Sequence, residues 1–159
     1  MNILITGARG FTASYLIPLL SKGDTHLFCT DLKSKKEQNY YPCDLTVFAS
    51  VYNLLEEIKP EQIYHLAGTF TNDYDIDYKA NVLTTRNILE SCFKLKLNCR
   101  TLLIGSAAEY GIVSKKDNPV KEEHPLNPVS IYGLTKLYQT SLMNYYYFTH
   151  KLDIVMART

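Results

Sequence analysis

The sequence predicts an α/β fold, a doubly wound parallel sheet that helices cover on both faces. Short apolar segments alternate with longer amphipathic ones along the chain, as parallel strands alternate with helical crossovers. A turn that contains two glycines joins the first apolar segment to the first amphipathic one. Because the 159 residues suit one domain and hold no internal repeat or low-complexity tract, we expect a single domain over residues 1–159.

The first half of the chain predicts four strands and two helices. Residues 2–6 are an apolar run typical of a buried strand, and a helix is expected over residues 11 to about 22. In that helix Leu16, Leu19 and Leu20 are expected on one face, and Pro18 should kink the helix or shift its start. The next elements are strands at 25–30 and 39–43, a helix at 46–58 and a strand at 62–67.

The second half predicts two long helices and two further strands around one irregular loop. Apolar residues at helical spacing predict a helix over residues 78–97, and a strand follows at 100–105. Three prolines and a glycine make residues 111–129 an irregular loop. A helix at 131–149 and a sixth strand at 153–157 complete the alternation.

Composition and charge exclude several function classes. The chain is 46% hydrophobic and 21% charged, and its net charge of +1 gives no bulk field toward nucleic acid or a charged membrane. The apolar run at residues 3–5 is too short for a signal peptide or a membrane span. Lys33, Lys35 and Lys36 form a short basic run that we interpret as a solvated loop.

The four cysteines show no C-x-x-C spacing, which disfavours a zinc site or dithiol chemistry. Free, buried thiols are the simplest interpretation, and they suit the reducing cytoplasm that we expect as the location. No metal site is predicted. The residues concerned are Cys29, Cys43, Cys92 and Cys99.

The glycine-rich turn at residues 6–13 has the features of a phosphate-binding turn. Gly7 and Gly10 permit a tight bend and a close backbone approach, and Ala13 is small where helix and strand pack. The free N–H groups of the following helix attract phosphates. Two glycines three residues apart are weak evidence alone, and an ordinary strand-to-helix turn is the alternative. The nucleotide contacts expected in this turn are Gly7, Arg9, Gly10, Phe11 and Thr12.

Asp31 follows the second predicted strand, where Rossmann-like folds carry an acid that binds ribose hydroxyls. A solvated loop carboxylate is the alternative reading. The negative charge of Asp31 favours NAD over NADP, since it would repel a 2′-phosphate. Arg9 and the nearby lysines could counter that repulsion, so NADP stays possible.

Tyr132 and Lys136 lie four residues apart and share one face of a predicted helix. An ammonium beside a phenol favours phenolate, so Lys136 is expected to lower the pKa of Tyr132 and make it an acid/base. Chance gives about one such pair in a chain of this composition. Tyr147 and Lys151 have the same spacing, but Tyr147 is expected to belong to a packed aromatic helix face.

Ser106 favours the first pair, because it follows the fifth predicted strand and strand ends line the ligand crevice of such sheets. Its hydroxyl is placed to donate to the oxygen that Tyr132 protonates. A hydroxyl that only closes the strand-to-loop turn is the alternative.

In these motifs the chain resembles the extended short-chain dehydrogenases that act on nucleotide sugars, the NAD-dependent epimerase/dehydratase family. Six motifs match the family in order along the chain. They are the glycine turn, the pair Asp44 and Leu45, the segment 65–68 (His-Leu-Ala-Gly), Asn81, Ser106 and the Pro-x-x-x-Tyr-Gly-x-x-Lys run at 128–136. The resemblance implies catalytic roles for Ser106, Tyr132 and Lys136. It makes Asn81 structural, and we assign His65 to packing near the cofactor.

The resemblance also implies ligand contacts beyond the glycine turn. The cofactor would be NAD, with NADP possible, and the substrate a nucleotide-diphosphate sugar. Asp44 has the alternative role of capping the helix that is expected near Thr46. The cofactor contacts implied are Asp44, Leu45, Leu66, Ala67, Gly68, Tyr132 and Lys136, and the substrate contacts are Thr69, Ser106, Ala107 and Tyr132.

Two departures from the family pattern narrow the expectation. Dehydratases of the family carry acidic or Ser-Glu residues where this chain has Ala107 and Ala108, and Glu109 comes one position late. Elimination of water needs a positioned acid and base, so an epimerase or a 4-keto reductase is expected. Family members also run to about twice this length, in two domains. The substrate domain would then follow Thr159, and a catalytically silent dinucleotide-binding module or a ligand-free scaffold remains an alternative.

The helices at 78–97 and 131–149 carry further apolar and aromatic residues. In the family the matching helices form the four-helix bundle of a dimer, so the resemblance implies a homodimer. Burial under a missing second half is the alternative. The residues concerned are Leu95, Leu97, Tyr138, Leu142, Tyr145, Tyr146 and Phe148.

Overall fold

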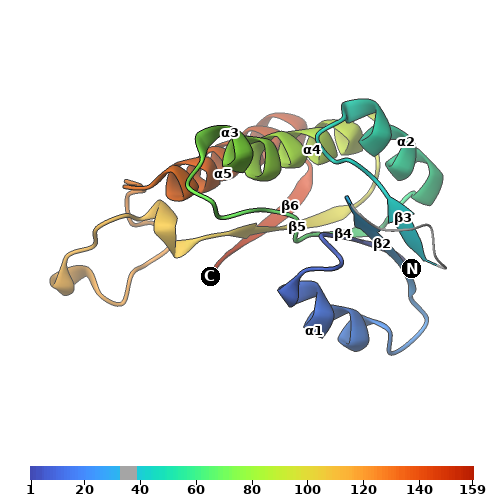
Figure 1. Cartoon of the computed structure of the whole chain (residues 1–159), viewed down its shortest axis with the longest axis horizontal. Helices are drawn as coiled ribbons and strands as arrows, with labels where there is room; N and C mark the ends of the chain where they lie inside the picture. Colours follow the sequence, from blue (N-terminus) through green and yellow to red (C-terminus); the bar gives the residue numbers. More distant parts are fainter. Residues whose placement is uncertain (33–38) are drawn as a thin grey trace.

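A computed structural model describes residues 1–32 and 39–159, so the basic run of Lys33, Lys35 and Lys36 lies outside the described residues. Six parallel strands form one sheet in the order β3-β2-β1-β4-β5-β6 (Figure 1). The doubly wound α/β prediction is therefore confirmed. The strands are β1 Asn2–Thr6, β2 His26–Asp31, β3 Tyr40–Pro42, β4 Gln62–His65, β5 Arg100–Gly105 and β6 Asp153–Arg158.

The helices follow the predicted order, with small shifts at their ends. The 111–129 loop is irregular as expected and contains one short 3₁₀ turn. The helices are α1 Phe11–Leu20, α2 Phe48–Ile58, α3 Tyr74–Asp77, α4 Thr84–Lys94 and α5 Ile131–His150, with a π-helical segment η1 Tyr78–Leu83 and 3₁₀ turns η2 Ala107–Glu109 and η3 Lys115–Asp117.

The face of α1 differs from the prediction. Ala13 is buried and Ile17 and Leu20 pack beside it on the sheet, whereas Leu19 is 62% exposed. Leu19 was expected on the same face as Leu20, but consecutive helical residues point about 100° apart. Pro18 lies in the last turn of α1, and the helix starts at Phe11, so Pro18 does not shift its start.

The long helix predicted at 78–97 begins four residues earlier, at Tyr74, and has three segments. Asp73 caps the first turn, since its carboxylate accepts a hydrogen bond from Ile76 N–H at 3.0 Å. In the π-helical middle the backbone bonds reach one residue further than in an α-helix, so the turns are wider there. Asn81, buried within this segment, points toward the ends of the sheet strands.

Helices cover the two faces of the sheet unevenly. Figure 1 shows α2, α4 and α5 along one face and α1 alone on the other. The large core packs α2 and α4 on β1 and β4, and a smaller cluster joins α5 to β5 and β6. On the α1 side, Leu102 and Ile104 are half-buried and Val155 is 44% exposed. Among the described residues, coverage of both faces is thus complete only near β1, β2 and β4.

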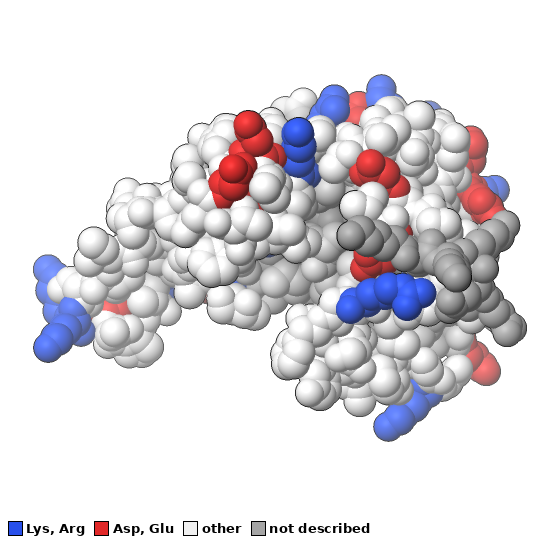
Figure 2. All heavy atoms as spheres, viewed as in Figure 1, with Lys and Arg blue, Asp and Glu red and all other residues white. Residues whose placement is uncertain are grey.

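Charged side chains are spread thinly on the surface. On the face in view, Figure 2 shows acidic and basic side chains scattered singly or in small groups. All four cysteines are buried and free, as predicted. In residues 1–32 and 39–159, no helix has the length and apolarity needed to cross a bilayer.

Candidate functional site

A cleft of about 310 Å³ opens at the carboxyl ends of β1, β2 and β4. The strand order reverses here, because β2 follows β1 on one side and β4 lies on the other, and open parallel sheets bind ligands at such a switch point. The predicted residues that line the cleft are Gly7, Gly10, Asp31, Asp44, Leu45, Leu66, Ala67, Gly68 and Thr69. Sequence reasoning did not single out the other lining residues, which are Leu32, Cys43, Thr46, Ala80 and Thr84.

The glycine turn has the backbone geometry that a phosphate site requires. Gly7 has φ +62°, and Gly10 N–H donates to the Gly7 carbonyl at 2.9 Å. Gly10 caps α1 without any side chain, so the first-turn N–H groups receive no side-chain cap. Phe11 and Thr12 lie exposed in that first turn and outside the cleft lining. The turn therefore offers backbone donors and the positive end of a ten-residue helix.

The two acids of the cleft are held by local hydrogen bonds. Asp31 accepts from the Arg9 backbone N–H at 3.2 Å, which ties the end of β2 to the glycine turn. Asp44 accepts from both the N–H and the hydroxyl of Thr46, at 2.9 and 2.6 Å. The helix α2 begins only at Phe48, after Val47, so the alternative role of Asp44 as a helix cap is wrong; Asp44 stabilises the turn before the helix instead.

At the other end of the cleft, Asn81 fastens the segment after β4. Its side chain accepts from Thr69 N–H and donates to the Thr69 carbonyl, both at 3.0 Å, and it also donates to the Thr135 hydroxyl. A Cβ added to Gly68 would lie 2.8 Å from Asn81 Oδ1, so this position has no room for a side chain. The structural role implied for Asn81 fits these bonds.

Lys136, on α5, lies beside Gly68, although Lys136, Ser106 and Tyr132 are not among the residues that line the cleft. Its Nζ lies 3.6 Å from the position of a Cβ on Gly68 and 5.7 Å from the centre of the Tyr132 ring. The side chain is 5% exposed, and Nζ donates to the Ile104 carbonyl at 2.9 Å. Burial lowers the pKa of Lys136 from 10.5 to about 8, while attraction to Glu109 and Asp77 opposes that fall.

Tyr132 is half-buried in the first turn of α5. Phe70 packs edge-on against its ring, with centroids 4.8 Å apart, and Asn72 Oδ1 accepts from the Tyr132 backbone N–H at 3.3 Å. Both neighbours come from the segment after β4, which the sequence did not link to Tyr132. Ser130 adds a second cap to the helix, since its hydroxyl accepts from Gly133 N–H.

Ser106 sits directly after β5 and caps the 3₁₀ turn η2, as its hydroxyl accepts from Ala108 N–H at 3.2 Å. This turn packs on the first turn of α5, because a Cβ on Gly133 would lie 2.5 Å from the Ala108 carbonyl oxygen. Ser106 and Tyr132 thus belong to two turns in direct contact. The alternative interpretation of Ser106, a hydroxyl that closes a turn, describes this capping bond.

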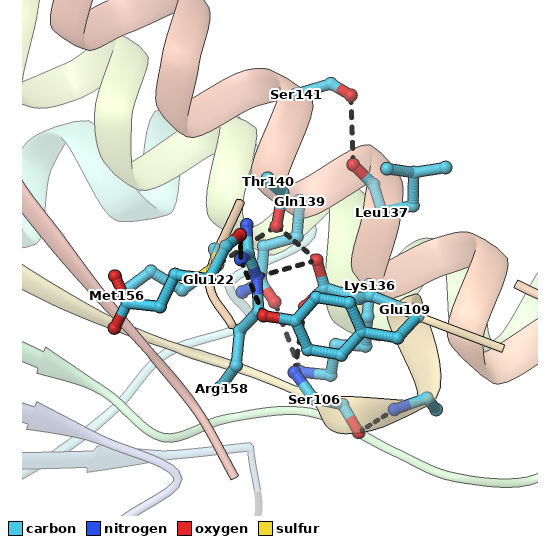
Figure 3. Close-up of polar contacts among 12 residues, drawn as sticks. Ser106, Glu109, Glu122, Lys136, Leu137, Gln139, Thr140, Ser141, Met156 and Arg158 are labelled. Carbon is cyan, nitrogen blue, oxygen red and sulfur yellow. Dashed lines mark hydrogen bonds and ion pairs between the residues drawn. The ribbon is translucent and has the colours of Figure 1, made fainter. Parts of the chain in front are cut away.

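Glu109 points away from the cleft and into the core. It is fully buried, and its carboxylate accepts from Ser106 N–H at 2.8 Å and from the Thr140 hydroxyl at 2.5 Å. Arg158 Nε lies 3.4 Å from the same carboxylate. Figure 3 shows these groups around Ser106 and Lys136. Ala107 is exposed and Ala108 is half-buried in η2. Glu109 is therefore the acidic residue of this turn, and its carboxylate is occupied by hydrogen bonds within the core.

His65 is fully buried at the end of β4, as expected for a packing residue. Nδ1 lies 2.8 Å from the Thr6 hydroxyl and Nε2 lies 3.1 Å from the Thr85 hydroxyl. Burial, with a smaller effect of Lys136, lowers the pKa of His65 to about 3, so the ring is neutral. Three clustered His, Cys, Asp or Glu side chains that could hold a metal ion do not occur in the described part of the chain.

Comparisons with known proteins match one family. A family model described as "NAD dependent epimerase/dehydratase family" matches residues 3–159. The chain is 28% identical to UDP-glucose 4-epimerase of Mycolicibacterium smegmatis, covering 96% of this chain and 53% of that protein. It is 32% identical to GDP-6-deoxy-D-talose 4-dehydrogenase of Aggregatibacter actinomycetemcomitans, covering 92% of this chain and 48% of that protein.

The fold also matches solved structures. UDP-glucose 4-epimerase from Brucella ovis, crystallised in complex with NAD, superposes with a TM-score of 0.88 at 25% identity, covering 99% of this chain and 51% of that one. The chain spans about half the length of the curated relatives that it matches, 53% and 48% for the two named above.

Proposed function

Because the chain belongs to the NAD-dependent epimerase/dehydratase family, we propose that it binds NAD and takes part in epimerising or reducing a nucleotide-diphosphate sugar at C4. One observation carries the proposal: the buried ammonium of Lys136 lies beside Gly68, in the lining of the same cleft as Gly7 and Gly10, and 5.7 Å from the centre of the Tyr132 ring.

The cleft residues fit a dinucleotide. The uncapped first turn of α1 would hold the pyrophosphate, and Gly7 and Gly10 would let it approach the backbone. Asp31 would accept from the adenosine ribose hydroxyls, and this favours NAD, with NADP as the alternative. Asp44 and Leu45 would line the adenine end, and residues 66–68 the nicotinamide end.

When bound, NAD supplies the hydride acceptor and donor for C4 of the sugar. Tyr132 would move the proton of the C4 hydroxyl, and the Lys136 ammonium would stabilise negative charge on the phenol oxygen and hold the ribose. Ser106 would donate to the same sugar oxygen, with Thr69 and Ala107 beside the substrate. The commitment of Glu109 to Ser106 and Thr140 supports an epimerase or reductase over a dehydratase.

Tyr132→Phe tests the chemistry. Loss of the acid/base should lower turnover of a nucleotide sugar at least about a hundredfold, with NAD affinity within about twofold, since the ring and its contact with Phe70 remain. UDP-glucose and GDP-4-keto-6-deoxy sugars should be assayed with NAD, with binding followed by calorimetry. Equal turnover by the variant would remove Tyr132 from the mechanism.

A second candidate is a dinucleotide-binding module without turnover of its own, favoured by the half-length match to the relatives. Calorimetry separates the two. NAD binding without nucleotide-sugar binding identifies the module, and binding of both with turnover identifies the enzyme. With either candidate we propose a cytoplasmic location, which the four free thiols favour.

We also propose a homodimer through α4 with η1 and α5. Four of the seven apolar residues named from the sequence pack in this chain's own hydrophobic clusters, so fewer of them are available for a dimer interface. These four are Leu95, Leu97, Leu142 and Tyr146. Tyr147, expected in a packed face, is 48% exposed. What supports the dimer is a shallow groove between η1 and α5, lined by Tyr78, Val82, Tyr138, Ser141 and Leu142.

Sedimentation equilibrium checks the dimer. We expect a monomer–dimer equilibrium that Tyr138→Glu shifts to monomer, because a charge would be buried in the pairing face. Tyr15→Glu, on the opposite face of the sheet and 65% exposed, is the matched control and should leave the equilibrium unchanged. A single monomeric species at high concentration would contradict the dimer.

A further inference from the structure

Gln139 lies one helical turn after Lys136 on α5 and is 1% exposed. Lys136 Nζ donates to its amide oxygen at 3.2 Å (Figure 3). The same Nζ also donates to the Ile104 carbonyl at 2.9 Å. An ammonium has three N–H bonds. Two are thus directed at protein oxygens, which leaves one N–H bond, and Nζ lies 3.6 Å from the position of a Cβ on Gly68, a residue of the cleft lining.

Thr85 fixes which way the Gln139 amide faces. Gln139 Nε2 donates to the Thr85 hydroxyl oxygen at 2.8 Å. The Thr85 hydroxyl donates its own proton to the Asn81 carbonyl at 2.7 Å, so toward Gln139 it can only accept. A flipped amide would place an acceptor against that oxygen and two donors against the ammonium. The amide oxygen of Gln139 is therefore held toward Lys136.

The same network continues to the glycine turn. His65 Nε2 lies 3.1 Å from the Thr85 oxygen and 3.3 Å from the Thr84 oxygen, and both of these hydroxyls donate to backbone carbonyls. Nε2 therefore carries the ring proton, and Nδ1 of the neutral ring accepts from the Thr6 hydroxyl, 2.8 Å away. The Thr6 oxygen in turn accepts from Ala67 N–H at 3.2 Å. Every proton in this chain of bonds has one direction. Its two ends are Thr6, at the start of the glycine turn, and Lys136, beside Gly68.

We propose that Gln139 is a positioning residue: its amide oxygen, oriented through Thr85, holds the Lys136 ammonium so that one N–H bond faces the cleft. This inference rests on the proposed function only for the role given to Lys136. The sequence did not single out Gln139, because spacing on α5 places it next to Lys136 but says nothing about the orientation of its amide.

Other charged groups around Lys136 act through space. Glu109 on η2 and Asp77 on α3 attract the ammonium, and His65 on β4 is neutral. Tyr132 on α5 presents its ring. Gln139 differs from all of these, since it makes a direct hydrogen bond to Nζ without a charge.

Two variants test the positioning role in the nucleotide-free chain. Gln139→Met keeps volume but removes the acceptor, and should lower the titration midpoint of Lys136 by about one pH unit. Gln139→Glu keeps an acceptor and adds an anion, and should raise the midpoint. The midpoint is followed by the ¹³Cε shift of labelled lysine, with Lys136→Arg to assign the signal. Thr149→Ala, exposed near the end of the same helix, should leave the midpoint unchanged.

The outcomes are distinct. If both Gln139 variants keep the wild-type Lys136 midpoint while their melting temperatures fall, Gln139 only fills space and the proposal is overturned. If Gln139→Met does not fold, Thr85→Val removes the hydroxyl that orients the amide, and an unchanged midpoint there overturns it as well. Calorimetry with NAD on the wild-type chain is read separately, so a failure of the proposed function leaves the lysine result intact.

Discussion

Gly7→Ala should weaken NAD binding and lower the stability of the chain. Gly7 has φ +62°, which costs an alanine about 1 kcal/mol. The added Cβ would lie 2.8 Å from both N and Cα of Ala67, and backbone atoms cannot rotate aside as a side chain can. Relief needs a shift of the glycine turn or of the segment after β4, and both line the cleft. We expect NAD affinity, measured by calorimetry, to fall at least about tenfold.

Gly23→Ala is the matched control. Gly23 also has a positive φ, +118°, but an added Cβ meets nothing within 4 Å, and it lies outside the cleft lining. Backbone strain alone should therefore lower its melting temperature and leave NAD affinity unchanged. If Gly7→Ala binds NAD as well as wild type, the turn is not the phosphate site, and the scaffold reading gains support.

Most of the sheet could be predicted from the sequence because buried parallel strands are short apolar runs between turns. β5 has the predicted bounds, and Asp31 ends β2 as expected. The face of α1 was harder. Almost every position from Tyr15 to Leu20 is apolar, so periodicity could not show that Ala13 and Ile17, and not Leu19, meet the sheet. The π-helical turn of η1 has no local sequence signal either.

The candidate site divides in the same way. The glycine turn and the residues after β4 could be placed in one cleft because parallel strands bring their carboxyl ends together. The contacts of Glu109 and Phe70 behind these residues could not be predicted from the sequence. Glu109 looks like a displaced active-site acid in the sequence, and only the fold turns it inward to Ser106 N–H and the Thr140 hydroxyl. Phe70 beside Tyr132 depends on how two segments far apart in the chain meet.

The free energy of unfolding should fall as the pH drops below about 6.5, because His65 is buried as a neutral ring. Its pKa is about 3 in the folded chain and near 6.5 once unfolded, so the unfolded state takes up the proton first. The contribution is full above pH 6.5 and is lost progressively as the pH falls toward 3. Each pH unit in this window costs about 1.4 kcal/mol per proton.

Carboxylates affect the pH dependence of stability only at the lowest pH values of that range. Hydrogen bonds from the segment 69–72 lower the pKa of Asp77, and Tyr146 and Lys94 lower that of Glu90, so both add acid sensitivity below roughly pH 4.5. Urea unfolding between about pH 5 and 7 therefore isolates His65. His65→Gln keeps a neutral polar group and should flatten the slope there, although its stability at neutral pH falls through lost bonds to Thr6 and Thr85. His26→Gln, exposed at the start of β2, should keep the wild-type slope. If His65→Gln keeps the full slope too, the buried neutral imidazole is not the group that titrates on unfolding.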